Sequence, residues 1–298
     1  MDINRANVNL LFTGVKKNFE QGLGTATQQY QKISDVVNST TAIESYPFLE
    51  QFGKMREWIG PKQIKNLASK NHDIKNRDFE STIGIKKNSI KDDTYGLYAP
   101  LYRGLGQTAG NIWDDLAFTA LCGNGSWLDG AAFFGTTRKY GKNTISNYVT
   151  GALTPATYAT ARTAMQLYLG HDGEPLGVIP NVLVVGPKME DMGRRILLND
   201  FWYDSTDKVQ INNPYKGTAE LVVSSRLVGT YDDYWFLLAT GGPLKPIIVQ
   251  KREEVNLIRK DMLTDDNMFF DGEAVYGAEA RGNAFMTMPH LAYGGIVA

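Results

Sequence analysis

Cysteine and histidine are scarce in this 298-residue chain. Cys122 is the one cysteine, so an intrachain disulfide is excluded, and the three histidines are His72, His171 and His290. A structural zinc site needs several cysteine or histidine ligands, and none of these histidines has the spacing of a helical metal pair. We therefore expect no metal site, and the low thiol content fits a chain made and kept in a reducing cytoplasm.

Excess charge and long apolar runs are also missing. The 31 Lys+Arg and 32 Asp+Glu give a net charge of −1, which argues against a dedicated nucleic-acid binder, whose surface is usually basic. The apolar stretch at residues 8–12 is too short to span a bilayer, and the N-terminus does not have the basic start and apolar run of a signal peptide. We expect no membrane partner. The hydrophobic content of 43% is enough for one large domain or two smaller ones.

No catalytic constellation stands out either. The candidates are three pairs of neighbouring carboxylates: Asp114 and Asp115, Asp232 and Asp233, and Asp265 and Asp266. Neighbours in a helix point to different faces, and pairs in turns are usually caps. Ser126 and Ser224 lie in no nucleophile motif, and Cys122 is most simply a small core residue. We assign no catalytic, cofactor-binding or metal-binding residue. A cytoplasmic hydrolase that uses one of the aspartate pairs is the alternative from a different class.

The N-terminal residues have the pattern of an arm. Val8, Leu11 and Val15 follow helical spacing, and Gly22 to Gly24 end the pattern. Such a short helix, followed by a loose Gln/Thr stretch, is expected to pack poorly on its own domain and better on a neighbour. Residues 33–49 are rich in Ile, Val, Ser and Thr and are predicted to be extended.

A basic segment follows. Residues 54–91 contain ten basic and four acidic residues. Within this segment, residues 78–90 alternate between apolar and polar positions as a strand does. We predict a long polar hairpin that reaches over a partner subunit, and a solvated surface hairpin is the plain alternative. The candidate intersubunit contacts are Lys75, Arg77, Lys86 and Lys87.

Residues 92–122 give the strongest helical pattern. Asp92, Asp93 and Thr94 are suitable capping residues. Leucines repeat every four residues, and the predicted buried face of this helix contains Leu97, Leu101, Leu105, Trp113 and Leu116. Pro100 and three glycines predict a kinked or two-part helix.

The remaining chain mixes helices and strands, which predicts the α+β class. Thr154 and Pro155 predict the start of a helix that runs to residue 169. A short buried strand at 182–185 precedes a helix at 188–198. The expected strands after that are 221–223, 235–239, 246–250 and 274–288.

Several segments, taken in order, resemble the Mu-like prophage major head subunit (gpT) family. They are residues 29–39, Glu57-Trp58-Ile59-Gly60, Phe79-Glu80 with Gly84-Ile85, residues 92–100, and Asp129-Gly130 with Phe133-Phe134. The start of the long helix at 92–100 is the most specific, and the resemblance is continuous over about residues 1–135. One departure is visible, because the family often has an acidic residue and then His-Pro after the Phe pair, where this chain has Gly135-Thr136-Thr137-Arg138.

The resemblance implies the tailed-phage major capsid fold, with five parts. These are an N-terminal arm (1–60), an extended loop (61–93), a peripheral domain with a long spine helix (94–144), an axial domain (145–245), and return strands of the peripheral domain (246–298). Arms and loops that a monomer leaves unsatisfied have a physical reason in a shell, because neighbouring subunits can cover them.

The implied function is that of a major capsid protein, not an enzyme. It would assemble in the host cytoplasm from hexamers and pentamers into the icosahedral head of a virion, enclosing double-stranded DNA without sequence readout. Scaffolding, portal and decoration proteins are the implied further partners, and no cofactor is expected. An encapsulin-like shell that packages enzymes is the alternative within the fold, and a tail-tube protein is a weaker one.

Overall fold

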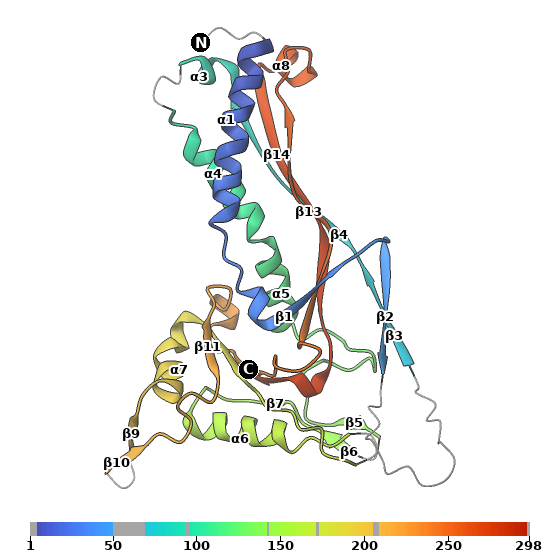
Figure 1. The fold of residues 1–298 in the computed structure, drawn as a ribbon, viewed down its shortest axis with the longest axis vertical. Coiled ribbons are helices and arrows are strands. Elements are labelled where there is room, and N and C mark those ends of the chain that lie inside the picture. Colours follow the sequence, from blue (N-terminus) through green and yellow to red (C-terminus); the bar gives the residue numbers. More distant parts are fainter. Residues whose placement is uncertain are drawn as a thin grey trace.

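A computed structural model describes residues 5–49, 69–92, 96–141, 143–170, 173–204 and 209–296. The molecule has an elongated upper half, a lower half with its own sheet, and a thin ribbon that leaves the middle of the molecule (Figure 1). The Glu57-Trp58-Ile59-Gly60 motif, the expected capping residues Asp93 and Thr94, and His171 lie outside the described residues.

The upper half is built on a four-stranded sheet of order β1-β13-β14-β4. Its strands are β1 (Ser34–Asn38), β4 (Arg77–Lys86), β13 (Ile247–Lys260) and β14 (Glu273–Met286). β13 and β14 form a long antiparallel pair, β4 extends the sheet beside β14, and β1 lies parallel to the first part of β13. The alternation at 78–90 therefore predicted a strand correctly as far as Lys86, whereas residues 87–90 belong to α3, and the partner of the strand is β14 and not a neighbouring strand within 61–93.

Helices cover one face of this sheet. They are α1 (Arg5–Gly24), α3 (Lys87–Asp92), α4 (Ala99–Gly110) and α5 (Ile112–Cys122). α4 and α5 meet at Asn111, which confirms the two-part helix. The helix begins at Ala99 and not near Asp92, because Asp92 ends the separate helix α3 and Pro100 occupies the first turn of α4.

The other face of the sheet is covered by the ribbon base at Ile248 and Phe285 and is exposed to solvent along β4 and the second half of β13. Along β4 the side chains alternate between partly buried and exposed, and the second half of β13 does the same. Phe79, Ile83 and Leu257 are on the covered face and pack towards the helices. Glu80, Thr82 and other polar side chains are on the open face. One buried face and one exposed face are typical of an antiparallel sheet.

The lower half contains a five-stranded sheet of order β11-β8-β12-β15-β7. Its strands are β7 (Tyr148–Val149), β8 (Val182–Val185), β11 (Glu220–Val223), β12 (Trp235–Leu238) and β15 (Ala292–Gly295). α6 (Pro155–Gln166) and α7 (Glu190–Leu197) pack on this sheet (Figure 1). Thr154 caps α6 through a reciprocal bond with Thr157, so the predicted helix start is confirmed, although the helix ends before residue 169.

Short elements complete the fold. They are α2 (Tyr30–Ile33), α8 (Asp266–Phe270), β2 (Ile43–Leu49), β3 (Ser69–Lys75), β5 (Arg138–Tyr140), β6 (Asn143–Ile145), β9 (Phe201–Asp204), β10 (Val209–Asn212), and 3₁₀ turns at Pro187–Met189, Gly229–Tyr231 and Pro289–Leu291. The last strand, β15, pairs in the lower sheet. Residues 246–298 were expected to be return strands of the peripheral domain. Within this range β13 and β14 belong to the upper sheet, whereas β15 belongs to the lower sheet.

One core joins the two halves. Trp113 of α5, Val249 of β13, and Phe236 of β12 belong to the same buried cluster. A second cluster around Tyr158 and Trp235 fills the lower half, and a third around Tyr102 and Tyr276 lies between the helices and the long strands. The ribbon of β2 and β3 has only a small cluster at its base.

Candidate assembly surfaces

The β2–β3 ribbon has little support from its own subunit beyond a small buried cluster at its base. Seven residue pairs link the two strands, from Ile43 with Lys75 to Leu49 with Ser69. A two-stranded ribbon is at best marginally stable alone, and this one runs from the middle of the molecule down beside the lower half, outside both sheets (Figure 1). The reaching element is therefore built from the strands at 43–49 and 69–75, not from a hairpin within 61–93.

The four candidate basic residues do not lie in one loop. Lys75 and Arg77 flank Asn76 at the base of the ribbon, whereas Lys86 ends β4 and Lys87 begins α3. Nine residue steps of a strand separate Arg77 from Lys86, which is roughly 30 Å. Lys75, Arg77 and Lys86 are exposed and Lys87 is half-buried. They form two separate basic positions, one at the ribbon base and one towards the far end of the sheet.

The N-terminal helix packs on its own subunit, contrary to the expectation of a loose arm. Val15 and Phe19 of α1 are buried against α4. A Cβ at Gly22 would overlap the carbonyl oxygen of Arg103, and one at Gly106 would overlap that of Phe19. The two helices approach this closely because glycines stand at both crossing points.

The buried face of the long helix differs from the predicted leucine stripe. Leu105, Trp113 and Leu116 are buried, but Leu97 is 71% and Leu101 52% exposed. Leu97 precedes α4, and the buried positions of α4 include Tyr102 and Gly106. The predicted burial of Leu97 and Leu101 is therefore wrong for the isolated chain, and both are apolar surface that a neighbour can cover.

Sequence reasoning missed a second apolar surface at the far end of the long strands. Phe269 and Phe270 of α8 are each 77% exposed, and their rings contact each other edge to face. The buried side chain of Met268 and the amide of Asn267, which donates to the carbonyl oxygens of Lys260 and Glu273, hold this turn in place. Two adjacent phenylalanines in a short turn were the available signal.

The three aspartate pairs have separate local roles. Asp114 is buried and accepts hydrogen bonds from the backbone N–H of Tyr30 (2.7 Å) and the hydroxyl of Thr27 (2.6 Å). Asp115 pairs with Arg226, and burial raises the pKa of Asp115.

The other two pairs lie on the surface or in a turn. Asp232 and Asp233 both contact Lys188, and Asp265 precedes α8 and accepts from the N–H of Met262. Asp232, Asp233 and Asp265 thus have local structural contacts, although the Asp265 side chain does not cap α8.

The remaining side chains that could take part in chemistry, Cys122, His72 and His290, lie in different parts of the molecule. Cys122 is in the core, where burial raises the pKa of its thiol to about 12. His72 lies on the ribbon and His290 in the lower half, where burial and then Arg138 lower the pKa of His290 to about 4. Among the residues that the structure describes, no group of His, Cys, Asp and Glu is arranged to hold a metal ion.

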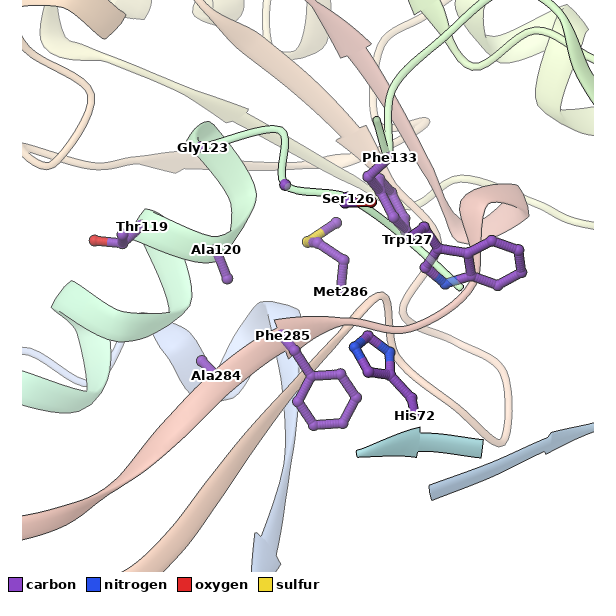
Figure 2. A pocket seen from close by; sticks show the side chains of 11 residues that line it. His72, Thr119, Ala120, Gly123, Ser126, Trp127, Phe133, Ala284, Phe285 and Met286 are labelled. Atoms are coloured by element: carbon purple, nitrogen blue, oxygen red, sulfur yellow. The ribbon is translucent and has the colours of Figure 1, made fainter. Parts of the chain in front are cut away.

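A cavity of about 210 Å³ lies where the ribbon meets the body. His72 and Phe285 stand on one side of the cavity, and Trp127 and Phe133 stand on the other (Figure 2). Small residues, among them Ala120, Gly123 and Gly125, line much of the rest. No helix in the described ranges is long and apolar enough to cross a membrane.

Comparison with known proteins gives a consistent result. The Mu-like prophage major head subunit gpT family model matches residues 8–155, 140–227 and 224–296. The chain is 27% identical over 296 residues to the Mu-like prophage FluMu major head subunit of Haemophilus influenzae, covering 98% of this chain and 74% of that protein. It is 25% identical over 283 residues to the major capsid protein of Escherichia phage Mu, covering 94% and 70%.

Solved structures agree. The procapsid of bacteriophage JBD30 is similar with a TM-score of 0.59 and 27% identity, covering 99% of this chain and 77% of that chain. The overall fold of this chain is thus similar to that of a bacteriophage procapsid protein. The chain belongs to the Mu-like prophage major head subunit gpT family and has the tailed-phage major capsid fold.

Proposed function

We propose that this major capsid protein assembles from hexamers and pentamers into a closed icosahedral head that encloses double-stranded DNA. The single observation that supports this most is the β2–β3 ribbon, which extends from the subunit with only a small buried cluster at its base. A ribbon of this kind is stabilised when a neighbouring copy covers it. The exposed side chains of Leu97, Leu101, Phe269 and Phe270 give further surface for such contacts.

The parts of the chain suggest a division of roles. β2 and β3 serve as the described part of the extended loop, and α4 with α5 serves as the spine helix. The four-stranded sheet and its helices form the peripheral domain. The five-stranded sheet with α6 and α7 forms the axial domain, to which β15 also contributes. Each subunit would bury far more than the roughly 1,600 Å² of a standard interface.

Assembly and completion of such a shell would involve further partner proteins. Scaffolding and portal proteins would act during assembly in the host cytoplasm, and decoration proteins would bind the finished virion. With a net charge of −1, the subunit would retain DNA by enclosure and not by tight phosphate binding. Binding of free DNA by the isolated subunit should therefore be weak, and tight binding with a steep salt dependence would contradict this.

Electron microscopy and sedimentation of the expressed protein test the proposal directly. Closed particles or capsomers support it, and a compact monomer at high concentration, under conditions that assemble related heads, contradicts it. The contents of particles formed in cells distinguish the alternatives: packaged enzymes favour an encapsulin-like shell. Substrate turnover by the purified protein would favour the alternative of a hydrolase that uses one of the aspartate pairs.

A further inference from the structure

Both limbs of the ribbon leave the body at one joint. β1 ends at Asn38 and β2 begins at Ile43, while Asn76 alone separates β3 from β4. Asn76 is buried, and its amide donates to the hydroxyl of Ser39 (2.8 Å) and the carbonyl oxygen of Thr41 (2.8 Å). The side chain of Asn76 thus ties the outgoing limb of the ribbon to the returning limb.

Gln250 of β13 connects this joint to the body. Its side chain is fully buried. Its Oε1 accepts a hydrogen bond from the hydroxyl of Tyr46 on β2 (2.8 Å), and its Nε2 donates to Oδ1 of Asn76 (2.6 Å). Because Asn76 uses its own N–H groups on Ser39 and Thr41, its Oδ1 can only accept, which fixes the orientation of the Gln250 amide. Gln250 therefore bonds side chains from both limbs at once.

Aromatic contacts repeat this arrangement one layer further out. Phe285 of β14 lies 4.9 Å from the ring of Tyr46 and 5.3 Å from the ring of His72 on β3, measured between ring centroids. One body residue again contacts one residue of each limb. Beyond His72 and Phe285 lies the cavity of about 210 Å³ (Figure 2). The cavity interrupts the packing of the ribbon base on that side, so we expect the hydrogen bonds at the joint to contribute to the direction of the ribbon beside the small cluster there.

We propose that Gln250 is a positioning residue for assembly, which holds the ribbon in the direction needed to reach a neighbouring subunit. This inference rests on the proposed function of the ribbon. Buried polar groups that are fully hydrogen-bonded favour a single arrangement, whereas an apolar replacement would leave the ribbon base packed but not directed. Every subunit of a shell needs its ribbon to point towards a neighbouring subunit. A wider spread of ribbon directions should therefore slow assembly more than it lowers the free energy of unfolding of the subunit.

Two variants remove the bonds in steps. Tyr46→Phe removes only the hydroxyl bond, and Gln250→Leu removes this bond together with the bonds from Nε2 to Asn76 and, at 3.5 Å, to the carbonyl oxygen of Ile74. Tyr168→Phe is the matched control, because the Tyr168 hydroxyl also makes one 2.8 Å bond, to the carbonyl oxygen of Ser146 in the lower half. Spin labels at Asn71→Cys on the ribbon and Asn256→Cys on the body, both exposed positions, report the ribbon direction, because Cys122 is buried.

We expect a narrow distance distribution in the parent chain and in Tyr168→Phe, a broader one in Tyr46→Phe, and the broadest in Gln250→Leu. Assembly rates measured by light scattering should fall about tenfold for Tyr46→Phe and further for Gln250→Leu, since one net hydrogen bond corresponds to about that factor. Unchanged distances and rates in Tyr46→Phe overturn the inference, even if Gln250→Leu does not fold. If the parent chain itself never assembles, the proposed function fails, while the distance distributions still show whether Gln250 positions the ribbon.

Discussion

Gly106 of α4 lies so close to Phe19 of α1 that a Cβ at position 106 would overlap the carbonyl oxygen of Phe19. Gly106→Ala should therefore separate the two helices and lower the free energy of unfolding by about 1–3 kcal/mol, as overpacked sites do. Urea denaturation of the unassembled subunit measures this change.

Gly104 provides the control on the same helix. A Cβ at Gly104 would meet no atom within 4 Å, so Gly104→Ala should raise the free energy of unfolding by about 0.5–1 kcal/mol through helix propensity alone. Equal effects of the two substitutions would show that α1 does not dock at Gly106.

Leu105 and Leu101 have the same side chain in opposite environments. Leu105 is 5% exposed and Leu101 is 52% exposed. Leu105→Ala should lower the free energy of unfolding by about 2–5 kcal/mol, because it loses burial and leaves a cavity, whereas Leu101→Ala should change it by less than about 0.5 kcal/mol. Thermal unfolding of the subunit measures both. A large loss for Leu101→Ala would place it in the core after all.

His290 should make the subunit sensitive to mild acid. It is buried beside the rings of Tyr140 and Tyr168, and its pKa falls from an ordinary value of 6.5 to about 4, mainly because burial disfavours the charged form. Between these two values the unfolded chain binds a proton that the folded chain does not. Stability is therefore fully present above about pH 6.5 and falls as the pH drops towards 4, by up to about 3 kcal/mol.

The variant His290→Phe isolates this effect, since an aromatic ring can keep the contacts with Tyr140 and Tyr168. Urea midpoints measured from pH 7 to pH 5 should decline less in His290→Phe than in the parent chain. His72 also has a lowered pKa, but it contributes equally to both proteins. Glu44, whose bonds to the N–H groups of Thr41 and Thr40 lower its pKa to about 2, acts only at more acid pH. Parallel pH profiles would contradict the prediction.

Local patterns in the sequence predicted individual elements well. The alternation in β4, the Thr154 cap of α6 and the buried run of β8 were each confirmed, because such signals depend on residues close together in the chain. The partner of β4 was not predictable in this way, because β14 follows β4 by almost the whole remaining chain. The ribbon was therefore assigned to the wrong strand pair.

The leucine stripe failed for a geometric reason. A four-residue repeat advances about 40° around a helix with every repeat, so it leaves the buried face within two repeats. Leu105 stays buried, whereas Leu101, one repeat earlier, is exposed. The exposure of Phe269 and Phe270 runs against the usual meaning of an apolar pattern, which is burial, and their adjacency in a short turn was the one signal for it.

The basic residues of the presumed loop give the sharpest test of which surface drives assembly. Reversing all four, as Lys75→Glu, Arg77→Glu, Lys86→Glu and Lys87→Glu, should leave melting of the unassembled subunit nearly unchanged and block shell formation. Each exposed ion pair contributes only about 0–1 kcal/mol, but every subunit of a shell repeats it.

The two halves of this set can be reversed separately, because the structure places Lys75 and Arg77 at the ribbon base and Lys86 and Lys87 at the other end of β4. If only the Lys75/Arg77 variant fails to form particles by electron microscopy, the contact lies at the ribbon. If only the Lys86/Lys87 variant fails, the contact lies near α8 and its exposed phenylalanines. Normal assembly of the fourfold variant would show that these charges are merely solvated, and loss of folding would show that they support the subunit itself.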